Sequence, residues 1–442
     1  MASLTELAEN ILAHAKRLDA FTTSKGLPSS SFDRHTLSDL PTDLEECRKS
    51  LVDACQSLKQ LGNGPIGQHY EVLFNFTDAL SLRFVYHYKL ALYVPDDEGI
   101  SFSELGRAAG VDETLVRRFL QHAMINGFFQ EKSPGFVSHS TASLLLKQSK
   151  GMQDTVGFLL YDIAPGSVHV IEAMQKWPHS GEPIETGFNI AEQTSDSFYQ
   201  HLARDKERSR RFGGGMRFMT QGSLYDINHL IDGYDWGALD RPGGCVVDVG
   251  GGHGGVSQAL ARATKHLKFV VQDLEGTVAE GTRLLPPDLS GRVEFMSHDF
   301  FKEQPIQHAD IYFFRFILHN WSDKYAAQIL EKLIPAMKHG SRVVIYEFLP
   351  DEVANTSWTQ KQKRNLDMIQ ATGWNSLERT ASDWRKLFAS VSKGYQFLGT
   401  KTPKGSAVSL IEASFETRQV NGVAGSNPIR DQLPDDTAVL AS

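Results

Sequence analysis

The stretch GCVVDVGGGHGG, residues 244–255, decides the fold. It predicts a short apolar strand that ends near Asp248, then a glycine-rich turn, then a helix over residues 254–265. The turn satisfies the spacing G-x-G-x-x-G. Glycines let the backbone approach a ligand closely, and the N-terminus of the helix offers free N–H groups. The motif has low specificity alone, but it favours an α/β sheet with a nucleotide site.

Each of the next two apolar runs also ends at an aspartate. Residues 268–273 end in Asp273, about twenty residues after the glycines, where a ribose hydroxyl is normally held. Residues 292–300 end in Asp299 and Phe300, a pair able to hydrogen-bond an adenine amino group and cover its ring. NAD and S-adenosylmethionine both present a ribose, but hydride chemistry does not require this second pair. The pattern therefore favours S-adenosylmethionine.

The stretch DIYFFRFILHNWSD, residues 310–323, places an imidazole at the end of an apolar run. In open α/β sheets ligands bind outside the carboxyl ends of the strands, so His319 is expected to face substrate rather than the core. Its ordinary pKa near ~6.5 suits proton abstraction at neutral pH. A histidine that only caps the following helix is the alternative interpretation.

Six short motifs give the chain a resemblance to a known family. They are Asp248-Val-Gly-Gly-Gly, Asp273-Leu, His298-Asp-Phe-Phe, Arg315-Phe-Ile-Leu-His-Asn-Trp-Ser-Asp, Val343-Val-Ile-Tyr-Glu and Leu377-Glu-Arg-Thr. In this order they resemble the caffeic-acid-type small-molecule O-methyltransferases, and the chain is most similar to fungal secondary-metabolite members. The resemblance extends over residues 70–416.

The resemblance implies an α/β fold. Its Rossmann-like, S-adenosylmethionine-binding sheet would be mostly parallel with a C-terminal antiparallel hairpin, joined to an α-helical, winged-helix-like N-terminal dimerisation domain. It implies methyl transfer from S-adenosylmethionine to a hydroxyl, with S-adenosylhomocysteine as product. His319 would be the general base, flanked by Glu347 and Glu378. On their own, Glu347 is equally typical of a strand-end helix cap, and Glu378 of a surface ion pair with Arg379.

The resemblance also implies which residues hold the cofactor. These are Asp248, Gly250, Gly251, Gly252, Asp273, Leu274, Asp299, Phe300, Arg315 and Trp321. Trp321 would pack on adenine or line the entrance, and Arg315 is alternatively a neutralised charge at a strand edge. His253, inside the turn, is expected only to shape the loop.

The acceptor site is expected on a helix over residues 361–374 and on the helices before the sheet. Asp367 and Met368 match the family pattern, and Asn320 stands where many relatives carry Asp, so that position brings no charge here. Further candidate lining residues are Trp374, Phe158, Phe188 and Met216. Packing in a helical core is the alternative role for the apolar ones.

The N-terminal part is expected to be helical, with helices over residues 4–20, 42–61 and 68–95. Residues 100–120 predict a helix, a glycine turn and a second helix, and a small hairpin follows, which together are typical of a winged helix. A DNA-binding regulator is therefore an alternative, with Arg117 and Arg118 as phosphate contacts. Two basic residues are few for that role on an acidic chain, and the resemblance implies dimerisation instead.

The predicted organisation has five parts. They are N-terminal, partly mobile helices (1–66), the winged-helix-like dimerisation domain (67–150), a helical linker and substrate-pocket wall (151–240), the Rossmann-like catalytic domain (241–417) and a disordered tail (418–442). The charged run of residues 204–211 is expected to be a solvated helix face.

Composition limits the class of protein. The 442 residues are 41% hydrophobic and 22% charged, enough for two domains. The net charge of -8 argues against a general nucleic-acid surface. Three cysteines without metal or disulfide spacing, and no membrane span or signal peptide, predict a cytoplasmic protein without a metal site.

The resemblance, together with the aromatic-rich pocket region, implies a phenolic hydroxyl on an aromatic or polyketide-type metabolite as acceptor, and the resemblance also implies a homodimer. An enzyme of the same fold recruited to a pericyclic rearrangement without methyl transfer is the second alternative. Neither the identity of the acceptor nor the position methylated follows from the sequence.

Overall fold

The computed structural model describes residues 3–33, 37 and 40–417. Its C-terminal half is built on a seven-stranded sheet of order β6-β5-β4-β7-β8-β10-β9. The strands are β4 (Cys245–Val249), β5 (Lys268–Asp273), β6 (Val293–Ser297), β7 (Ile311–Arg315), β8 (Arg342–Glu347), β9 (Tyr395–Lys401) and β10 (Ser409–Phe415). The first five in spatial order are parallel, and β10 runs antiparallel to both β8 and β9. The predicted sheet with a C-terminal antiparallel hairpin is confirmed.

Helices cover both faces of this sheet, which explains why its central strands are almost continuously apolar. On β7, Tyr312 and Phe314 belong to one buried cluster with α16 and α18, whereas Ile311 and Phe313 belong to another with α13 and α14. The covering helices are α13 (Asn228–Gly233), α14 (Gly255–Ala263), α15 (Glu275–Leu284), α16 (Asp323–Leu333) and α18 (Ala381–Val391). Alternation along the strand thus supplies two cores.

The N-terminal helices contain the expected interruption. Helix α1 (Leu4–Ser24) packs on α2 (Thr42–His87), which consists of two helical arms that meet at a kink. Gly64, at the kink, has a non-helical φ of 63°, and Pro65 follows it. Proline removes a helix hydrogen bond and clashes with the preceding turn, so the pair interrupts the helix. The predicted domain boundary at residue 66 lies next to this kink.

The predicted helix, turn, helix and hairpin follow. They are β1 (Ile100–Ser101), α4 (Phe102–Ala109), α5 (Glu113–Ile125), β2 (Gln130–Ser133) and β3 (Phe136–Ser138), with short helices α3 (Leu90–Tyr93) and α6 (Thr141–Gln148) beside them. Gly110 ends α4 with a φ of 69°, a left-handed conformation that glycine adopts without strain. The strands form an antiparallel sheet of order β1-β3-β2.

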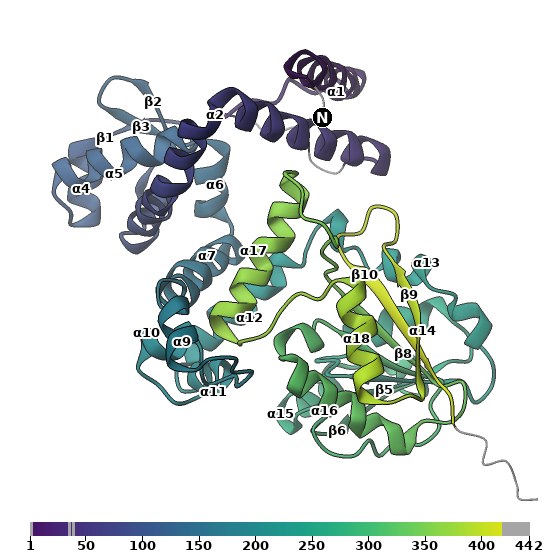
Figure 1. Ribbon diagram of the computed structural model, residues 1–442. Coiled ribbons are helices and arrows are strands. Elements are labelled where there is room, and N and C mark those ends of the chain that lie inside the picture. The colour runs from purple at the N-terminus through teal and green to yellow at the C-terminus, as the bar shows by residue number, and fades with distance from the viewer. Residues whose placement is uncertain (1–2, 34–36, 38–39, 418–442) are drawn as a thin grey trace, which may run out of the picture.

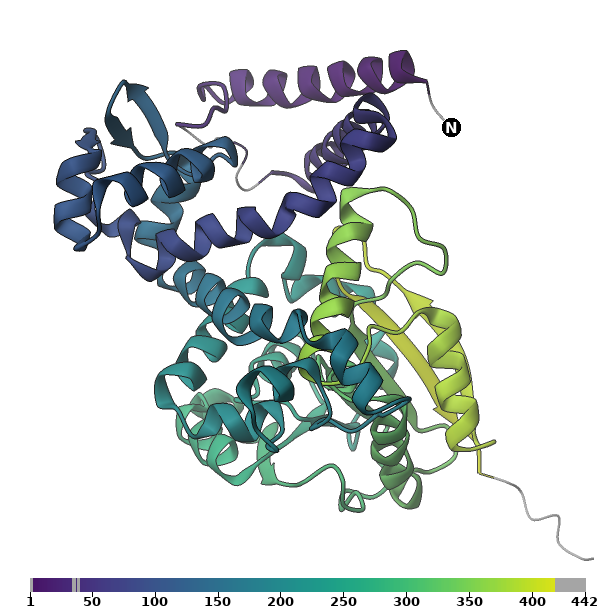
Figure 2. The ribbon, with the colours of Figure 1, turned by 60° about the vertical axis from the view of Figure 1, so that its left-hand side comes forward.

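A helical region connects these parts (Figure 1). It comprises α7 (Lys150–Gly157), a π-helix over Phe158–Ile163, α8 (Ala164–Ser167), α9 (Val170–Lys176), α10 (Gly187–Glu192), α11 (Phe198–Ala203) and α12 (Lys206–Met219). Helix α17 (Trp358–Gly373) contacts this region and α2, and Figure 2 shows the purple α1–α2 hairpin above it.

The charged run of residues 204–211, predicted to be a solvated face, is solvated only in part: residues 204–207 and 210 are exposed, but Arg208 and Arg211 are not. Asp162 of the π-helix is 1% exposed and accepts hydrogen bonds from Arg208 at 2.8 Å and from Arg211 at 2.8 Å. Arg208 also pairs with Glu192 at 2.9 Å. The alternating charges predicted a solvated face. The carboxylates that bind Arg208 and Arg211, however, lie on other helices.

Three further expectations concern membrane spans, metal sites and the C-terminal tail. Among residues 3–33 and 40–417, no helix combines the length and apolar character that a membrane span requires. Within the described residues, no three His, Cys, Asp or Glu side chains are grouped as metal ligands would be. The predicted tail, residues 418–442, lies outside the described residues.

Candidate active site

The glycine turn leaves no room for side chains at Gly250 and Gly251. Gly250 has a φ of 73°, and a Cβ there would stand 2.6 Å from Ile317 Cδ1. A Cβ on Gly251 would stand 2.6 Å from Asp248 Cγ. Gly252 has a φ of 59°, which L-residues with side chains rarely adopt. The backbone of the turn is therefore bare where strand β4 meets α14.

Asp248 braces this turn from inside the protein. It is 2% exposed, and its Oδ2 accepts a hydrogen bond from Ser257 Oγ at 2.6 Å. Burial raises the pKa of the Asp248 carboxyl to about 6, although the bond from Ser257 lowers it. Asp248, one of the predicted cofactor residues, therefore contacts α14, the helix that follows the turn. It lies on the buried side of the glycine turn.

Asp273 and Asp299 lie at the ends of the next two strands, as predicted. Asp273 accepts the backbone N–H of Gly252 at 2.9 Å and of Leu274 at 2.8 Å. The N–H of His298 donates to the Asp273 carbonyl at 3.0 Å, which brings the end of β6 beside the end of β5. Asp299 accepts the N–H of Phe301 at 3.0 Å. The three strand ends thus form one edge.

Aromatic side chains stand at this edge after β6 and β7. Phe300 contacts the Trp321 ring edge-on, with ring centroids 5.9 Å apart. Phe301 makes a similar contact with Trp321 at 4.8 Å. Leu274 is 67% exposed. The predicted cofactor residues at the ends of β5, β6 and β7 therefore lie at one edge of the sheet. We call this group, together with the glycine turn, the cradle.

Arg315, the last residue of β7, has an unpaired donor at the same edge. Its Nε is buried and has no hydrogen-bond partner among the described residues. Burial lowers the pKa of the guanidinium, and the nearby charge of Asp248 raises it. An unpaired buried donor is costly unless a ligand satisfies it. The Nε of Arg315 is thus an orphaned donor, while the charge of the guanidinium has that of Asp248 nearby.

His319 and Glu378 form a buried pair. His319 lies on a 3-10 turn, Leu318–Asn320, and its Nδ1 donates to Glu378 Oε1 at 2.8 Å. The two residues are 9% and 3% exposed. Burial lowers the pKa of His319, but the charge and hydrogen bond of Glu378 outweigh it, so the pKa is raised. In the neutral imidazole, a proton on Nδ1, which the Glu378 carboxylate favours, leaves the lone pair on Nε2.

Glu347 holds the backbone beside His319 and not its ring. It ends β8, is 0% exposed, and its Oε1 accepts the N–H groups of Ile317 at 2.9 Å, Leu318 at 2.7 Å and His319 at 3.3 Å. Burial raises the pKa of this carboxyl. Glu347 therefore combines the two readings of the sequence, since it stands beside the histidine and caps the turn that carries it.

A cavity of about 340 Å³ opens onto His319. Its walls come from the π-helix, α11, α12, the segments after β7 and β8, and α17. It is lined by Phe158, Tyr199, Phe212, Met216, Arg217, Met219, Thr220, Tyr225, Phe316, His319, Asn320, Phe348, Leu366, Ile369, Gln370, Trp374 and Glu378. Most of these side chains are apolar or aromatic, so a flat apolar molecule fits the cavity. We call it the acceptor cavity.

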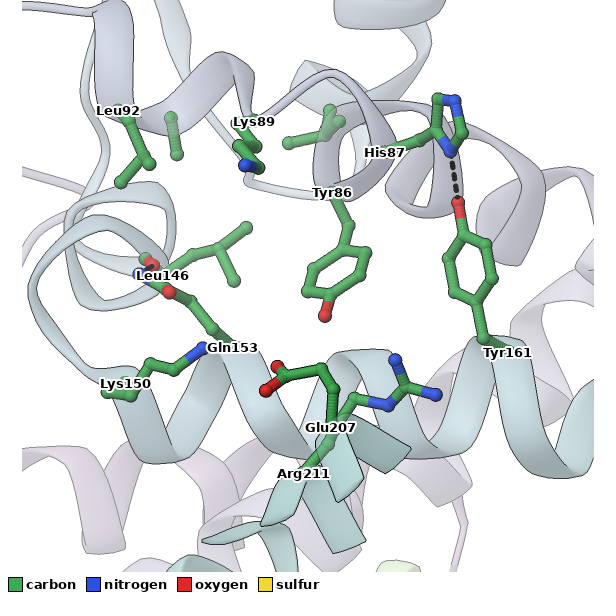
Figure 3. Close-up of a pocket in the computed structure, with 12 residues that line it drawn as sticks. Tyr86, His87, Lys89, Leu92, Leu146, Lys150, Gln153, Tyr161, Glu207 and Arg211 are labelled. Carbon is green, nitrogen blue, oxygen red and sulfur yellow. Dashed lines mark hydrogen bonds between the residues drawn. The ribbon is translucent and has the colours of Figure 1, made fainter. Parts of the chain in front are cut away.

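A second cavity lies between α2 and the helical region (Figure 3). In it, the Tyr161 hydroxyl lies 2.8 Å from His87 Nδ1. Its cations are partly neutralised, because Arg211 binds Asp162 and Lys150 binds Asp154 at 3.1 Å. The cavity shares no lining residue with the acceptor cavity.

Comparisons with known proteins match this geometry. The O-methyltransferase domain family matches residues 177–396. A chlorophenol O-methyltransferase of Trichoderma longibrachiatum is 35% identical and the match covers 93% of this chain and 90% of that protein. For O-methyltransferase AMT9 of Alternaria alternata the identity is 36%, with 93% and 98% covered. The chain belongs to the O-methyltransferase family.

Solved structures share the fold of this O-methyltransferase. OxaC in complex with SAH and oxaline aligns with a TM-score of 0.71 at 21% identity, over 93% of this chain and 99% of that chain. LepI in complex with SAM aligns with a TM-score of 0.68 at 21% identity, over 93% and 100%. The family uses S-adenosylmethionine, and the chain is an S-adenosylmethionine-dependent O-methyltransferase.

The cradle of the methyltransferase fits this cofactor on two observations. The glycine turn is bare on its open face, and the Arg315 Nε is a buried donor without a partner among the described residues. S-adenosylmethionine offers a carboxylate and hydroxyl oxygens as acceptors for such donors. The cradle and His319 lie at the same edge of the sheet, because β4 and β7 are hydrogen-bonded neighbours.

Arg379 is a functional residue that the sequence analysis missed. It is 1% exposed and pairs with Asp323 at 2.8 Å instead of with Glu378. Its two terminal nitrogens donate to the carbonyls of Leu318 at 2.9 Å and Trp321 at 2.7 Å. Arg379 holds the carbonyls of the His319 turn while Glu347 holds its N–H groups. The Glu-Arg-Thr motif was a signal, but it did not give the direction of the side chain.

Two residues that were predicted to line the acceptor site, Met368 and Phe188, do not line the cavity. Met368 is 61% exposed, because the cavity takes Leu366, Ile369 and Gln370 from α17. Phe188 is 0% exposed and does not line the cavity; it packs behind it on Phe198, with ring centroids 4.9 Å apart.

The other predictions have mixed outcomes. Phe158, Met216, Trp374 and Asn320 do line the cavity. Asp367 does not line the cavity, but its Oδ1 accepts the N–H of Glu378, the partner of His319, at 2.9 Å.

Gln370 is a second residue that the sequence analysis missed. It is 6% exposed, and its Nε2 lies 3.2 Å from His319 Nδ1 and 3.4 Å from Asn320 Oδ1. Ser376 Oγ donates to its Oε1 at 3.1 Å. The Asn320 amide in turn donates to the Phe316 carbonyl at 3.1 Å. The neutral Asn320 thus joins a network of amides around the base. The role of Gln370 could have been recognised only from the face of α17 that meets the cavity.

Proposed function

We propose that this O-methyltransferase methylates a phenolic hydroxyl of an aromatic or polyketide-type secondary metabolite, with His319 as general base. The observation that carries the proposal is the bond of 2.8 Å between His319 and Glu378 at the wall of an aromatic cavity. A base held by a carboxylate beside a space for a flat molecule suits removal of a phenolic proton.

S-adenosylmethionine, when bound, supplies an electrophilic methyl group. The chain supplies the base: His319 Nε2 accepts the hydroxyl proton while Nδ1 stays bonded to Glu378. A phenol with a pKa near ~10 is mostly neutral at pH 7, so its oxygen gains nucleophilicity as the proton leaves. Glu378 stabilises the imidazolium that forms. The apolar walls exclude water and orient the ring, and positioning of this kind is worth up to ~7–11 kcal/mol.

We assign the cofactor contacts to the cradle. Gly250, Gly251 and Gly252 would allow close approach, and Asp273 with Leu274 would bind the ribose. Asp299, Phe300 and Trp321 would hold the adenine. Arg315 would donate to an acceptor of the cofactor, and Asp248 would act by holding the turn. The orphaned Nε of Arg315 supports this assignment.

We infer that the protein works as a homodimer through a winged-helix-like N-terminal domain, in the cytoplasm. The support is a stretch of α2 with large apolar side chains that are each at least 48% exposed: Leu61, Ile66, Tyr70, Val72, Leu73, Phe74, Phe76 and Leu80. A helix that exposes so many apolar groups is typically buried in an assembly. Most soluble oligomers are symmetric homo-oligomers, so a second copy is the expected partner.

Neither alternative function gains support. For DNA binding, Arg117 is occupied by Glu113 at 2.8 Å and stands 4.2 Å from the Phe102 ring centroid. For a pericyclic reaction, the neighbour described as a pericyclic reaction enzyme shares the fold at 21% identity and a TM-score of 0.67. A rearrangement without hydroxyl deprotonation gives no role to the buried His319–Glu378 pair.

The test is mass spectrometry of phenols and polyketides incubated with methyl-labelled S-adenosylmethionine. Wild type and the surface control His339→Ala should transfer the label, and His319→Ala should lose most of it. Wild type that isomerises a reactive polyene without transferring label to any acceptor would contradict the proposal.

A further inference from the structure

We propose that the acceptor carries an anionic group such as a carboxylate, and that Arg217 recognises it. The inference rests on the proposed function, because it specifies the molecule that enters the acceptor cavity. Arg217 lies on α12 between Met216 and Met219, both of which line the same cavity. Arg217 itself lines the cavity and is solvent-exposed, so its charge is accessible to a ligand.

The arginines near Arg217 are occupied. Arg204 pairs with Asp196 at 2.6 Å, Arg208 and Arg211 both bind Asp162 at 2.8 Å, and Arg210 binds Asp154 at 2.8 Å. Arg217 alone of these five has no carboxylate partner among the described residues. The other four arginines are thus bound to three carboxylates, Asp196, Asp162 and Asp154, whereas Arg217 is left for a ligand.

The charges inside the acceptor cavity lead to the same conclusion. Glu378, the one carboxylate among the lining residues, is 3% exposed and bound to His319 Nδ1 at 2.8 Å, so it is turned to the base. The remaining walls are apolar, aromatic, hydroxyl, imidazole or amide groups. Arg217 is therefore the one solvent-exposed charge among the described residues that line the cavity, and it favours a negative ligand.

The charge of the whole protein makes a local cation the more useful to an acidic acceptor. The net charge of -8 disfavours anions in general, so a cation at this cavity favours an anionic acceptor there. Guanidinium suits this role because its planar fork binds a carboxylate through two parallel hydrogen bonds. In the second cavity the guanidinium among the lining residues, Arg211, is already bound to Asp162.

The test compares matched acids and esters. Isothermal titration of the full-length protein with S-adenosylhomocysteine present would use 3-hydroxy-2-naphthoate, 6-hydroxy-2-naphthoate and their methyl esters. Wild type should bind at least one acid about ten-fold more tightly than its ester, as one charge-assisted bond allows. Arg217→Gln should remove that preference while leaving ester binding unchanged. Arg283→Gln, on the exposed face of α15, is the matched control and should keep it.

Several results would overturn the inference. They are equal binding of acids and esters by wild type, no binding of either acid, or a preference for acids that survives in Arg217→Gln. Methyl transfer to the same compounds is measured in parallel. A preference that depends on Arg217 without any methyl transfer would uphold the recognition and contradict the proposed function instead.

Discussion

At the scale of single residues, the two glutamates beside His319 have different roles. Glu378 contacts the ring at Nδ1, whereas Glu347 contacts only the backbone of the turn. The first controls the protonation of the base and the second controls its position. Substituting each should therefore change different kinetic quantities.

Glu378→Gln should lower kcat by about 10²–10⁴, the usual contribution of general base catalysis, with little change in KM. Glu378 raises the pKa of His319, and a protonated imidazole cannot accept a proton. The rate should therefore fall as pH drops through that raised pKa, above the ordinary ~6.5. In Glu378→Gln the midpoint should move to lower pH. A profile of kcat against pH checks this, and an unmoved midpoint would contradict it.

Arg379→Lys should lower kcat by about ten-fold or more. Lysine keeps the charge but cannot span Asp323 and the carbonyls of Leu318 and Trp321, so the turn would lose alignment. Arg385→Lys, exposed on the neighbouring α18, is the control and should behave as wild type. Equal kcat values for the two variants at saturating acceptor would show that Arg379 does not position His319.

The sequence identified His319, Glu347 and Glu378 because motifs preserve order along the chain. It did not identify Arg379 or Gln370, because their roles depend on side-chain direction. The error at Met368 has the same origin: which face of α17 meets the cavity depends on how the helix packs.

At the scale of elements, buried ion pairs fix the helices that form the cavity wall. Asp162 on the π-helix joins Arg208 and Arg211 of α12, and Phe158 of the same π-helix lines the acceptor cavity. π-Helical turns often occur at functional sites. The network ties the cavity wall to the core.

Asp162→Ala should destabilise the protein by about 3–5 kcal/mol, because it leaves the partly buried guanidinium of Arg211 without its carboxylate, while Arg208 keeps only Glu192. Glu207→Ala, at an exposed pair with Arg210, should cost less than about 1 kcal/mol. Urea unfolding of both variants gives the two values. Similar values would mean that the network adds no more than a surface pair.

Elements of the sheet could be predicted, since apolar runs and turn residues have local signatures. The interruption within α2 could be predicted too, because Gly64 and Pro65 are local signals and the structure kinks there. The surroundings of the charged run 204–211 could not, because the carboxylates that bind Arg208 and Arg211 are distant in the chain.

At the scale of the whole molecule, the exposed apolar stretch of α2 predicts a dimer. Light scattering should give twice the chain mass of 49.2 kDa. The double variant Tyr70→Glu and Phe74→Glu should weaken the dimer by placing unpaired charges in the interface. Val353→Glu, at an exposed apolar site in the loop before α17, is the control. A monomeric wild type at micromolar concentration would contradict the prediction.

The sequence predicted the overall class through the order of its motifs, and the strand order places those motifs at one edge. The relation between α2 and α17 was not predictable, since it depends on contacts such as the Thr359 N–H donating to Asp53 Oδ1 at 3.3 Å. The helix that exposes the apolar stretch therefore also touches the helix that lines the acceptor cavity.

The most direct test of His319 as general base uses phenols of graded acidity. The measurement is kcat/KM of wild type and His319→Ala at one pH for acceptors of similar shape. For phenols with pKa near ~10 the variant should lose on the order of 10³-fold, and the loss should shrink toward none for phenols already ionised at the assay pH. A loss that is the same for every phenol would contradict the account, because His319 would then act on binding or folding and not on the proton.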